Sequence, residues 1–189
     1  FAGGINSRFA VDNCLIHGPG LQINVSDAKP RKVILRHNTI VRAMSMRVFL
    51  VKIDESIGED SSPPIEVEMS GNVLTSPVLS LGQSGVFLKN EKALDASQSE
   101  QLLKKLVSWR GNENLFSLSK PFLLGFATDK KDFPFTPSVT KLDDWKVFWG
   151  LKELDGQLGQ AKFQGGDLVA KAADTPELVT PHDFRLRSD

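Results

Sequence analysis

The densest group of side chains that could do chemistry is an acidic cluster made of Asp54, Glu55, Glu59 and Asp60. Carboxylate oxygens suit calcium, and a pair of carboxylates can act as acid and base on a glycosidic bond. The cluster lacks the regular Asp spacing of a calcium-binding loop, and acidic runs usually face water. We therefore expect a solvated loop, and we predict no metal site and no cofactor for this chain.

Three histidines are the candidate general bases: His17, His37 and His182. A base needs a group that it can activate, and no nucleophile motif such as Gly-x-Ser-x-Gly lies near any of them. His17 follows its nearest Asn in the sequence, whereas His37 precedes its own, so a repeat centred on Asn does not align them. We expect structural or surface roles and predict no catalytic residue.

A third candidate group is basic: Arg36, Arg42 and Arg47 fall close together in the sequence, near Arg31 and Lys32. Guanidinium groups match the geometry of carboxylates, so these side chains could bind a polyanionic sugar. A solvated outer face explains them equally well. We prefer the solvated face because the net charge of the chain is zero.

Trp109, Trp145 and Trp149 are aromatic residues that could stack on sugar rings. Apolar residues accompany them at helical spacing, which is typical of a helix face packed on a core. We therefore expect the three tryptophans to be core residues rather than a sugar-binding platform.

A short phrase that recurs four times sets the architecture that must position these side chains. In each copy an Asn follows an extended stretch and precedes two or three strand-forming residues, and Asn tolerates the left-handed conformation of a sharp bend. Stacked bends of this kind turn a chain into a parallel coil of short strands. The four copies are Val11–Ile16, Leu35–Val41, Met69–Leu74 and Gly111–Phe116, with their Asn at Asn13, Asn38, Asn72 and Asn114.

The repeat makes specific placements testable. We expect Asn38 and Asn72 to lie at stacked bends, and Ile40 and Val73 to point into the core. The segments that we expect in parallel strands include Val33–Leu35, Val67–Met69 and Val73–Leu74.

Two segments interrupt the strand pattern with helical spacing. Residues 94–109 carry a capping box ahead of apolar residues at helical intervals, which predicts a helical insertion. Residues 140–150 predict a short helix with Thr140 as its N-cap. The pair Asp143-Asp144 falls in the first turn of that helix, where carboxylates favour the helix dipole.

The strand–Asn–strand phrase resembles the right-handed parallel β-helix of pectate-lyase-like proteins. The stretch Leu142–Gly150, followed by Asp183–Arg187, whose alternation predicts a final strand, is similar to the end of β-helix regions in planctomycete-type bacteria. Some of these regions follow a serine/threonine kinase and a membrane span. The resemblance implies an all-β fold, a right-handed parallel β-helix of few coils with short covering helices. The length of the chain fits one domain over residues 1–189, and we expect this domain to belong to a longer chain with upstream domains.

The catalytic residues of the β-helix enzymes do not carry over. Asn38-Thr39 is followed by Ile40 where polygalacturonase-type hydrolases have Asp, and His17-Gly18 lacks the preceding Gly. No Arg-Ile-Lys occurs, and Asp143-Asp144 is explained by its place in a helix. We therefore assign no catalytic residue from the resemblance.

The composition of the chain argues against several classes of function. The chain has 189 residues, with 23 basic and 23 acidic side chains, which argues against a nucleic-acid partner. It has no apolar run of membrane-spanning length, and its single cysteine, Cys14, allows no internal disulfide and no thiolate zinc cluster. We expect a non-catalytic recognition or scaffold module, extracellular, periplasmic or on the cell surface, with a polysaccharide or a protein as its partner. The alternative is a polysaccharide lyase or glycoside hydrolase.

Overall fold

The structure of the protein is a computed structural model. It describes residues 8–17, 21–25, 32–41, 46–50, 63–75, 78–83, 96–117, 124–128, 136–150, 152–168, 171, 175 and 178–187.

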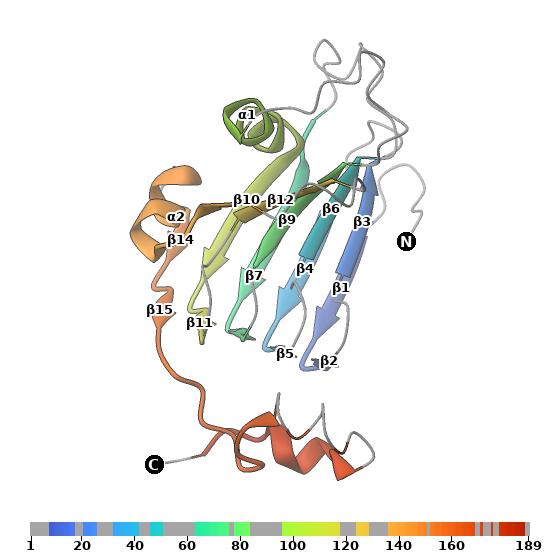
Figure 1. Cartoon of the computed structure of the whole chain (residues 1–189), viewed down its shortest axis with the longest axis vertical. Coiled ribbons are helices and arrows are strands. Elements are labelled where there is room, and N and C mark those ends of the chain that lie inside the picture. Colours follow the sequence, from blue (N-terminus) through green and yellow to red (C-terminus); the bar gives the residue numbers. More distant parts are fainter. Residues whose placement is uncertain are drawn as a thin grey trace.

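The described strands form three sheets of five strands each, and from β1 to β12 every third strand joins the same sheet (Figure 1). Sheet 1 contains, in spatial order, β1 (Arg8–Asp12), β4 (Lys32–Arg36), β7 (Ile65–Ser70), β10 (Val107–Asn112) and β14 (Glu153–Leu154). Sheet 2 contains β15 (Gln157–Leu158), β11 (Leu115–Phe116), β8 (Val73–Leu74), β5 (Thr39–Val41) and β2 (Leu15–His17). Sheet 3 contains β13 (Thr136–Val139), β12 (Leu124–Thr128), β9 (Leu79–Gln83), β6 (Met46–Leu50) and β3 (Leu21–Val25).

The expected all-β fold, a right-handed parallel β-helix, is wrong for this chain. Sheets 1 and 2 are parallel throughout, but β13 pairs antiparallel with β12 in sheet 3. Helices make up 22% of the described residues, and within these residues the short strands are not joined into a closed or solenoid sheet. The repeated phrase dictates how neighbouring strands pair, but it does not dictate the path of the segments between them, and those segments include helices and an antiparallel return.

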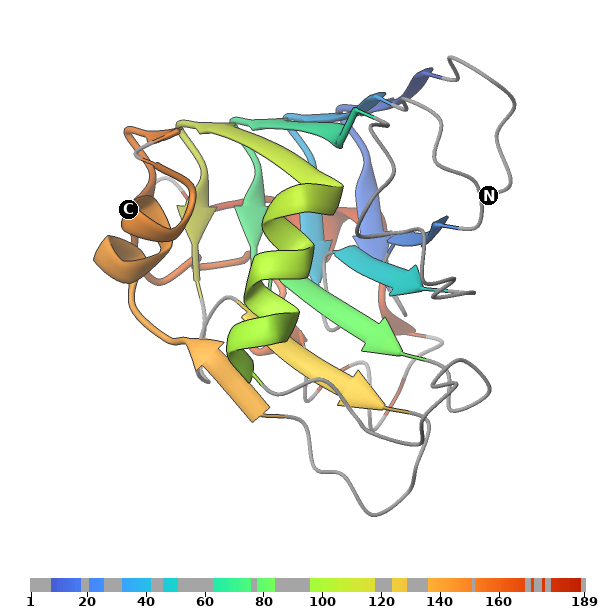
Figure 2. The same ribbon diagram turned by 90° about the horizontal axis from the view of Figure 1, so that it is seen from above.

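Two helices accompany the sheets. Helix α1 (Ala96–Leu106) is shorter than the expected 94–109, because the chain turns into strand β10 at Val107. Figure 2 shows α1 lying across the space between sheet 1 and sheet 3. Helix α2 (Leu142–Phe148) has Lys141, not the expected Thr140, as its N-cap residue.

The expected final strand is also corrected. Residues Pro181–Phe184 form a 3₁₀ helix, η4, and only Leu186 makes a bridge, to Phe163. The proline at the start of η4 fixes φ and suits the first turn of a helix, which outweighs the alternating pattern of the following residues.

A buried ladder of Asn side chains joins sheet 1 to sheet 2. Asn38, Asn72 and Asn114 are each 0–1% exposed. The Oδ1 atom of each accepts a hydrogen bond from the backbone one strand earlier in the stack: from Cys14 N to Asn38 at 2.9 Å, from Asn38 N to Asn72 at 2.9 Å, and from Asn72 N to Asn114 at 3.1 Å. The Nδ2 atoms donate to backbone carbonyls: Asn38 to Val11 at 3.0 Å, Asn72 to Leu35 at 2.9 Å, and Asn114 to Met69 at 3.0 Å. The predicted stacking of Asn38 and Asn72 is therefore confirmed.

The left-handed residue of each turn is the one before the ladder position. Its φ is +52° at both Asn13 and His37, +61° at Gly71, +55° at Glu113 and +53° at Asp155. The register pairs Leu15 with Thr39, so Cys14 and not Asn13 occupies the ladder position of the first turn. The alignment of Asn13 with the other three Asn was thus off by one residue, and the fifth turn, at Asp155-Gly156, was missed.

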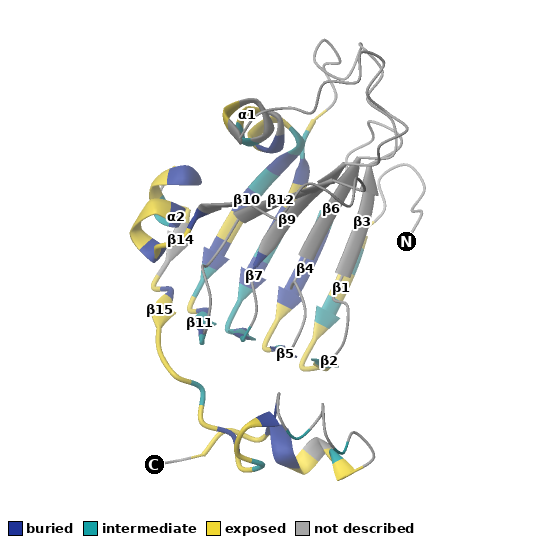
Figure 3. Ribbon diagram, viewed as in Figure 1, coloured by how far each residue is buried: buried dark blue, intermediate teal, exposed yellow. Residues whose placement is uncertain are grey.

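The main core lies between the sheets and is filled from alternating strand positions (Figure 3). Val33 and Leu35 pair in parallel with Val67 and Met69, as expected. Ile40 is 1% exposed and lies in this core, as predicted. The prediction for Val73 is wrong, since Leu74 enters the main core and Val73 packs, partly buried, against a second cluster.

The second hydrophobic cluster attaches the C-terminal segment, by which we mean the described residues between 159 and 187, to sheet 2. It joins Val41 of β5 to Phe163, Leu168 and Phe184, and Figure 1 shows the segment lying beyond the ends of β2, β5 and β11. Helix α2 covers the core at another edge, where Trp145 packs on Trp109 with ring centroids 5.0 Å apart.

We predict that Asn72→Ala lowers the free energy of unfolding by about 3 kcal/mol, because it leaves buried backbone and amide groups above and below it without partners. Urea melts measure the loss. The matched control is Asn112→Ala, which removes the same side chain from a half-buried position in sheet 1. Equal losses for the two variants would contradict a structural role for the ladder.

Candidate functional site

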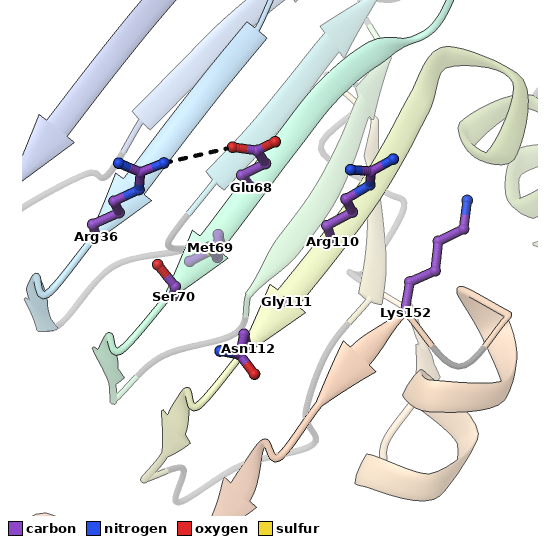
Figure 4. Close-up of a pocket in the computed structure, with 8 residues that line it drawn as sticks. All are labelled: Arg36, Glu68, Met69, Ser70, Arg110, Gly111, Asn112 and Lys152. Atoms are coloured by element: carbon purple, nitrogen blue, oxygen red, sulfur yellow. Dashed lines mark ion pairs between the residues drawn. The ribbon is translucent and has the colours of Figure 1, made fainter.

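A groove of about 460 Å³ lies on the outer face of sheet 1. Figure 4 shows Arg36, Glu68, Arg110 and Lys152 standing in a row across the strands on this face. The residues that line it are Arg36 of β4, Glu68, Met69 and Ser70 of β7, Arg110, Gly111 and Asn112 of β10, and Lys152 just before β14.

Strand alternation places these residues. Glu68 and Arg110 occupy outward positions between inward neighbours such as Met69 and Gly111, which are buried. The parallel register sets Glu68 directly opposite Arg110, on strands that lie about 4.8 Å apart. The groove therefore has a polar rim and a floor of buried backbone and side chains.

The charges over β4 and β7 balance one another. Lys32 Nζ lies 2.6 Å from Glu68 Oε1 and 3.4 Å from Glu66 Oε2. Arg36 lies 3.9 Å from the other oxygen of Glu68. The pKa of the Lys32 ammonium is raised, chiefly by its hydrogen bond to Glu68. Two cations thus share two carboxylates over β4 and β7, and of these four residues Arg36 and Glu68 line the groove.

The charges over β10 and β14 do not balance. The register of β10 with β14 places Arg110 beside Lys152, and the backbone bond from Gly111 N to the Lys152 carbonyl, 2.8 Å, holds the two segments together. Both side chains are exposed, and neither has an ion-pair partner among the described residues. Like charges opposite each other on neighbouring strands repel, and a bound anion relieves that repulsion.

The groove is lined by cations and hydrogen-bonding groups, with one carboxylate among its described residues. Glu68 is its only carboxylate among the described residues, and Glu68 already has two cationic partners. Within the described residues no group of three His, Cys, Asp or Glu side chains is placed to hold a metal ion. Two cations with a hydroxyl and an amide nearby, from Ser70 and Asn112, can hold an anion that also carries hydroxyl groups.

The structure brings one of the three candidate arginines, Arg36, into the groove, with Lys32 beside it. Arg47 lies on β6 in sheet 3, so it belongs to a different sheet. Arg31, Arg42 and the acidic residues Asp54, Glu55, Glu59 and Asp60 lie outside the described residues.

The histidines are dispersed. His37 is exposed at a left-handed turn, with Nδ1 3.1 Å from Asp12 Oδ1. His182 is exposed in η4, and His17 ends β2. The three histidines thus lie on a strand, a turn and a 3₁₀ helix.

The tryptophans form a core cluster. Trp109 and Trp145 are 0% exposed and Trp149 is 6% exposed, and the rings of Trp109 and Trp149 are stacked with centroids 6.0 Å apart. None of the three is placed to receive a sugar, which agrees with the core assignment made from helical spacing. The indole Nε1 atoms of Trp145 and Trp149 have no hydrogen-bond partner in the described structure, and the two rings meet edge to face at 5.5 Å.

The sequence interpretation missed Arg110 and Lys152. The available signal was the alternation in Val107–Asn112, whose burial pattern is regular once the segment is read as a strand. The interpretation instead extended a helix to residue 109, which hid the outward position of Arg110.

A second hollow of about 710 Å³ lies between sheet 2 and the C-terminal segment. Lys162 and Arg187 line it together with Asp167, so charges of both signs meet there. The Ser117 Oγ atom on its wall accepts a hydrogen bond from Ala161 N at 2.7 Å and anchors the segment.

Asp183 connects Lys171 and Thr180 within the C-terminal segment, and we call this set of contacts the Asp183 lock. Its Oδ1 lies 2.7 Å from Lys171 Nζ, and its Oδ2 accepts from Thr180 N at 2.7 Å and from Thr180 Oγ1 at 2.9 Å. The bond from Lys171, followed by the bonds from Thr180, lowers the pKa of Asp183 to about 2. Gly165 packs so closely that an added Cβ would lie 2.5 Å from Asp183 Cβ.

When the chain is compared with protein-family models, curated proteins and solved structures, none of them matches it. None of the helices in the described part of the chain has the length and apolar character needed to cross a membrane.

We predict that the Asp183 lock loses its contribution to stability in acid. The folded pKa lies below the ordinary value of 3.8, so the ionised form is favoured by folding. The contribution is complete above about pH 4, and it is lost as pH falls towards about 2. Urea melts of wild type and Asp183→Asn should differ by a constant amount above this window and converge within it. Asp144→Asn, at an exposed position of α2, is the control, and a gap between wild type and Asp183→Asn that persists unchanged at pH 2 would contradict the lock.

Proposed function

We propose that the protein is a non-catalytic recognition module that binds an acidic polysaccharide in the groove on sheet 1. The observation that carries this proposal is the pair Arg110 and Lys152, two neighbouring cations on an open groove with no ion-pair partner in the described structure. An anion seated between them is bound by charge-assisted hydrogen bonds, which are stronger than neutral ones.

The rest of the groove supports a sugar polymer as the ligand. Ser70 and Asn112 supply a hydroxyl and an amide beside the cations, which suits the hydroxyl groups of a sugar. The groove runs across the strands on an open sheet face, so a long chain can pass through it (Figure 4). The zero net charge of the protein disfavours a nucleic acid, whose binding draws on a larger basic surface. Such polymers coat cells, so an extracellular, periplasmic or cell-surface location is part of the proposal.

The alternative, a polysaccharide lyase or a glycoside hydrolase, has no complete catalytic set to support it among the described residues. Hydrolysis of a glycosidic bond uses two carboxyl groups on either side of the bond. The described groove offers only Glu68, which two cations hold.

The experiment measures binding of a uronate polymer and of a neutral glucan by isothermal titration calorimetry at low and at moderate salt. Wild type should bind the uronate polymer, with lower affinity at the higher salt concentration, and should show no binding of the glucan. The double variant Arg110→Ala/Lys152→Ala should bind the uronate polymer about tenfold to a hundredfold more weakly, because it loses two charged hydrogen bonds.

The control removes the same two charges elsewhere. Lys105→Ala/Lys141→Ala changes two exposed lysines outside the groove and should leave the affinity unchanged. Equal losses in the two double variants, or no binding by wild type, would overturn the proposal. New reducing or unsaturated ends in the bound polymer would show an enzyme instead.

A further inference from the structure

The two halves of the groove differ in net charge. Over β4 and β7, Lys32 and Arg36 are matched by Glu66 and Glu68. Over β10 and β14, neither Arg110 nor Lys152 forms an ion pair among the described residues, although Glu68 lies opposite Arg110 on the neighbouring strand. One half of the groove is therefore neutral and the other carries two positive charges.

Glu68 stands at the boundary between the two halves. It lies opposite Arg110 in the register, and it also reaches both cations of the neutral half. Its side chain is 26% exposed and lines the groove, so a ligand that crosses the strands passes over it. Figure 4 shows Arg36 and Glu68 joined on the side of the groove away from Lys152.

This arrangement treats two kinds of acidic polymer differently. A ligand carboxylate above Arg110 and Lys152 meets two cations. A second carboxylate one sugar further along meets Glu68, and it must compete with Glu68 for Arg36. Like charges at such distances repel, and the repulsion grows as water is excluded from the groove. An uncharged sugar at the same place meets no repulsion, and its hydroxyl groups can contact Ser70.

We infer that the groove selects polymers whose carboxylates are separated by an uncharged sugar, and that Glu68 is the residue that sets this selectivity. The inference rests on the proposed binding of an acidic polysaccharide in the same groove. Glu68 acts by excluding a second charge, so its removal should change binding of a fully charged polymer more than binding of one with alternating charge.

The experiment compares two oligosaccharides of equal length. One is a hyaluronan oligosaccharide, in which a uronate alternates with an uncharged sugar, and the other is an oligogalacturonate, in which every sugar is charged. Wild type should bind the alternating oligosaccharide about tenfold more tightly, the effect of one unfavourable charge contact. Glu68→Gln should tighten binding of the oligogalacturonate about tenfold and remove the preference.

Two further variants test whether the preference depends on Glu68 itself. Glu66→Gln removes a carboxylate from the same face of β7 that lies outside the groove lining, so it should keep the wild-type preference. Ser70→Glu adds a carboxylate to the neutral half and should strengthen the preference. This variant moves selectivity in the opposite direction from Glu68→Gln, so general damage to the fold cannot imitate the pair of results.

The failures of the two proposals are distinguishable. If neither oligosaccharide binds wild type, or if Arg110→Ala/Lys152→Ala changes nothing, the proposed function falls and the selectivity falls with it. If both bind through Arg110 and Lys152 but Glu68→Gln and Glu66→Gln have the same effect, only the role of Glu68 is overturned. A wild-type preference for the oligogalacturonate also overturns it.

Discussion

The buried amide ladder of Asn38, Asn72 and Asn114 is the interaction on which the rest of the structure depends. Sharp turns between sheet 1 and sheet 2 bring backbone N–H and carbonyl groups into the interior, where an unpaired polar group is costly. The Asn side chain carries both an acceptor and a donor, so one residue satisfies both kinds of group in the neighbouring strand. An ionised Asp side chain at the same position would lack the donor, and a Leu side chain would lack both the donor and the acceptor.

The ladder also sets the register of the sheets that meet at it. In a parallel sheet, a slip by one residue exchanges the inward and outward faces of a strand. Asn72 bonds to the backbone of the turn before it and Asn114 to that of Asn72, so β4, β7 and β10 are aligned in one frame. That frame puts Arg110 opposite Glu68 on the outer face. The groove is therefore a consequence of the buried turns.

The ladder has defined ends. Cys14 at the first position and Gly156 at the last have no amide side chain to extend it. The C-terminal segment adds stability from another direction, because it buries Val41 of sheet 2 under Phe163 and Phe184. Asp183 stabilises this segment through contacts with Lys171 and Thr180, which both belong to the segment itself.

The sequence by itself determined the features that rest on local chemistry. Three of the four repeated Asn are where the pattern placed them, the strands that flank Asn38 and Asn72 pair in parallel, and α1 and α2 form within the segments with helical spacing. Helical periodicity and turn preference act over a few residues, so they can be read from a single chain.

Tertiary structure decided the remainder. The fold class was wrong because the repeat does not specify the segments between its copies, and the expected final strand became η4. The groove was not foreseen because it joins Arg36, Glu68, Arg110 and Lys152, which are far apart in the sequence. Their meeting depends on the register of four strands, and that register is set by hydrogen bonds between turns 24 to 42 residues apart. The balance of charge in the groove follows from that register and from no local pattern.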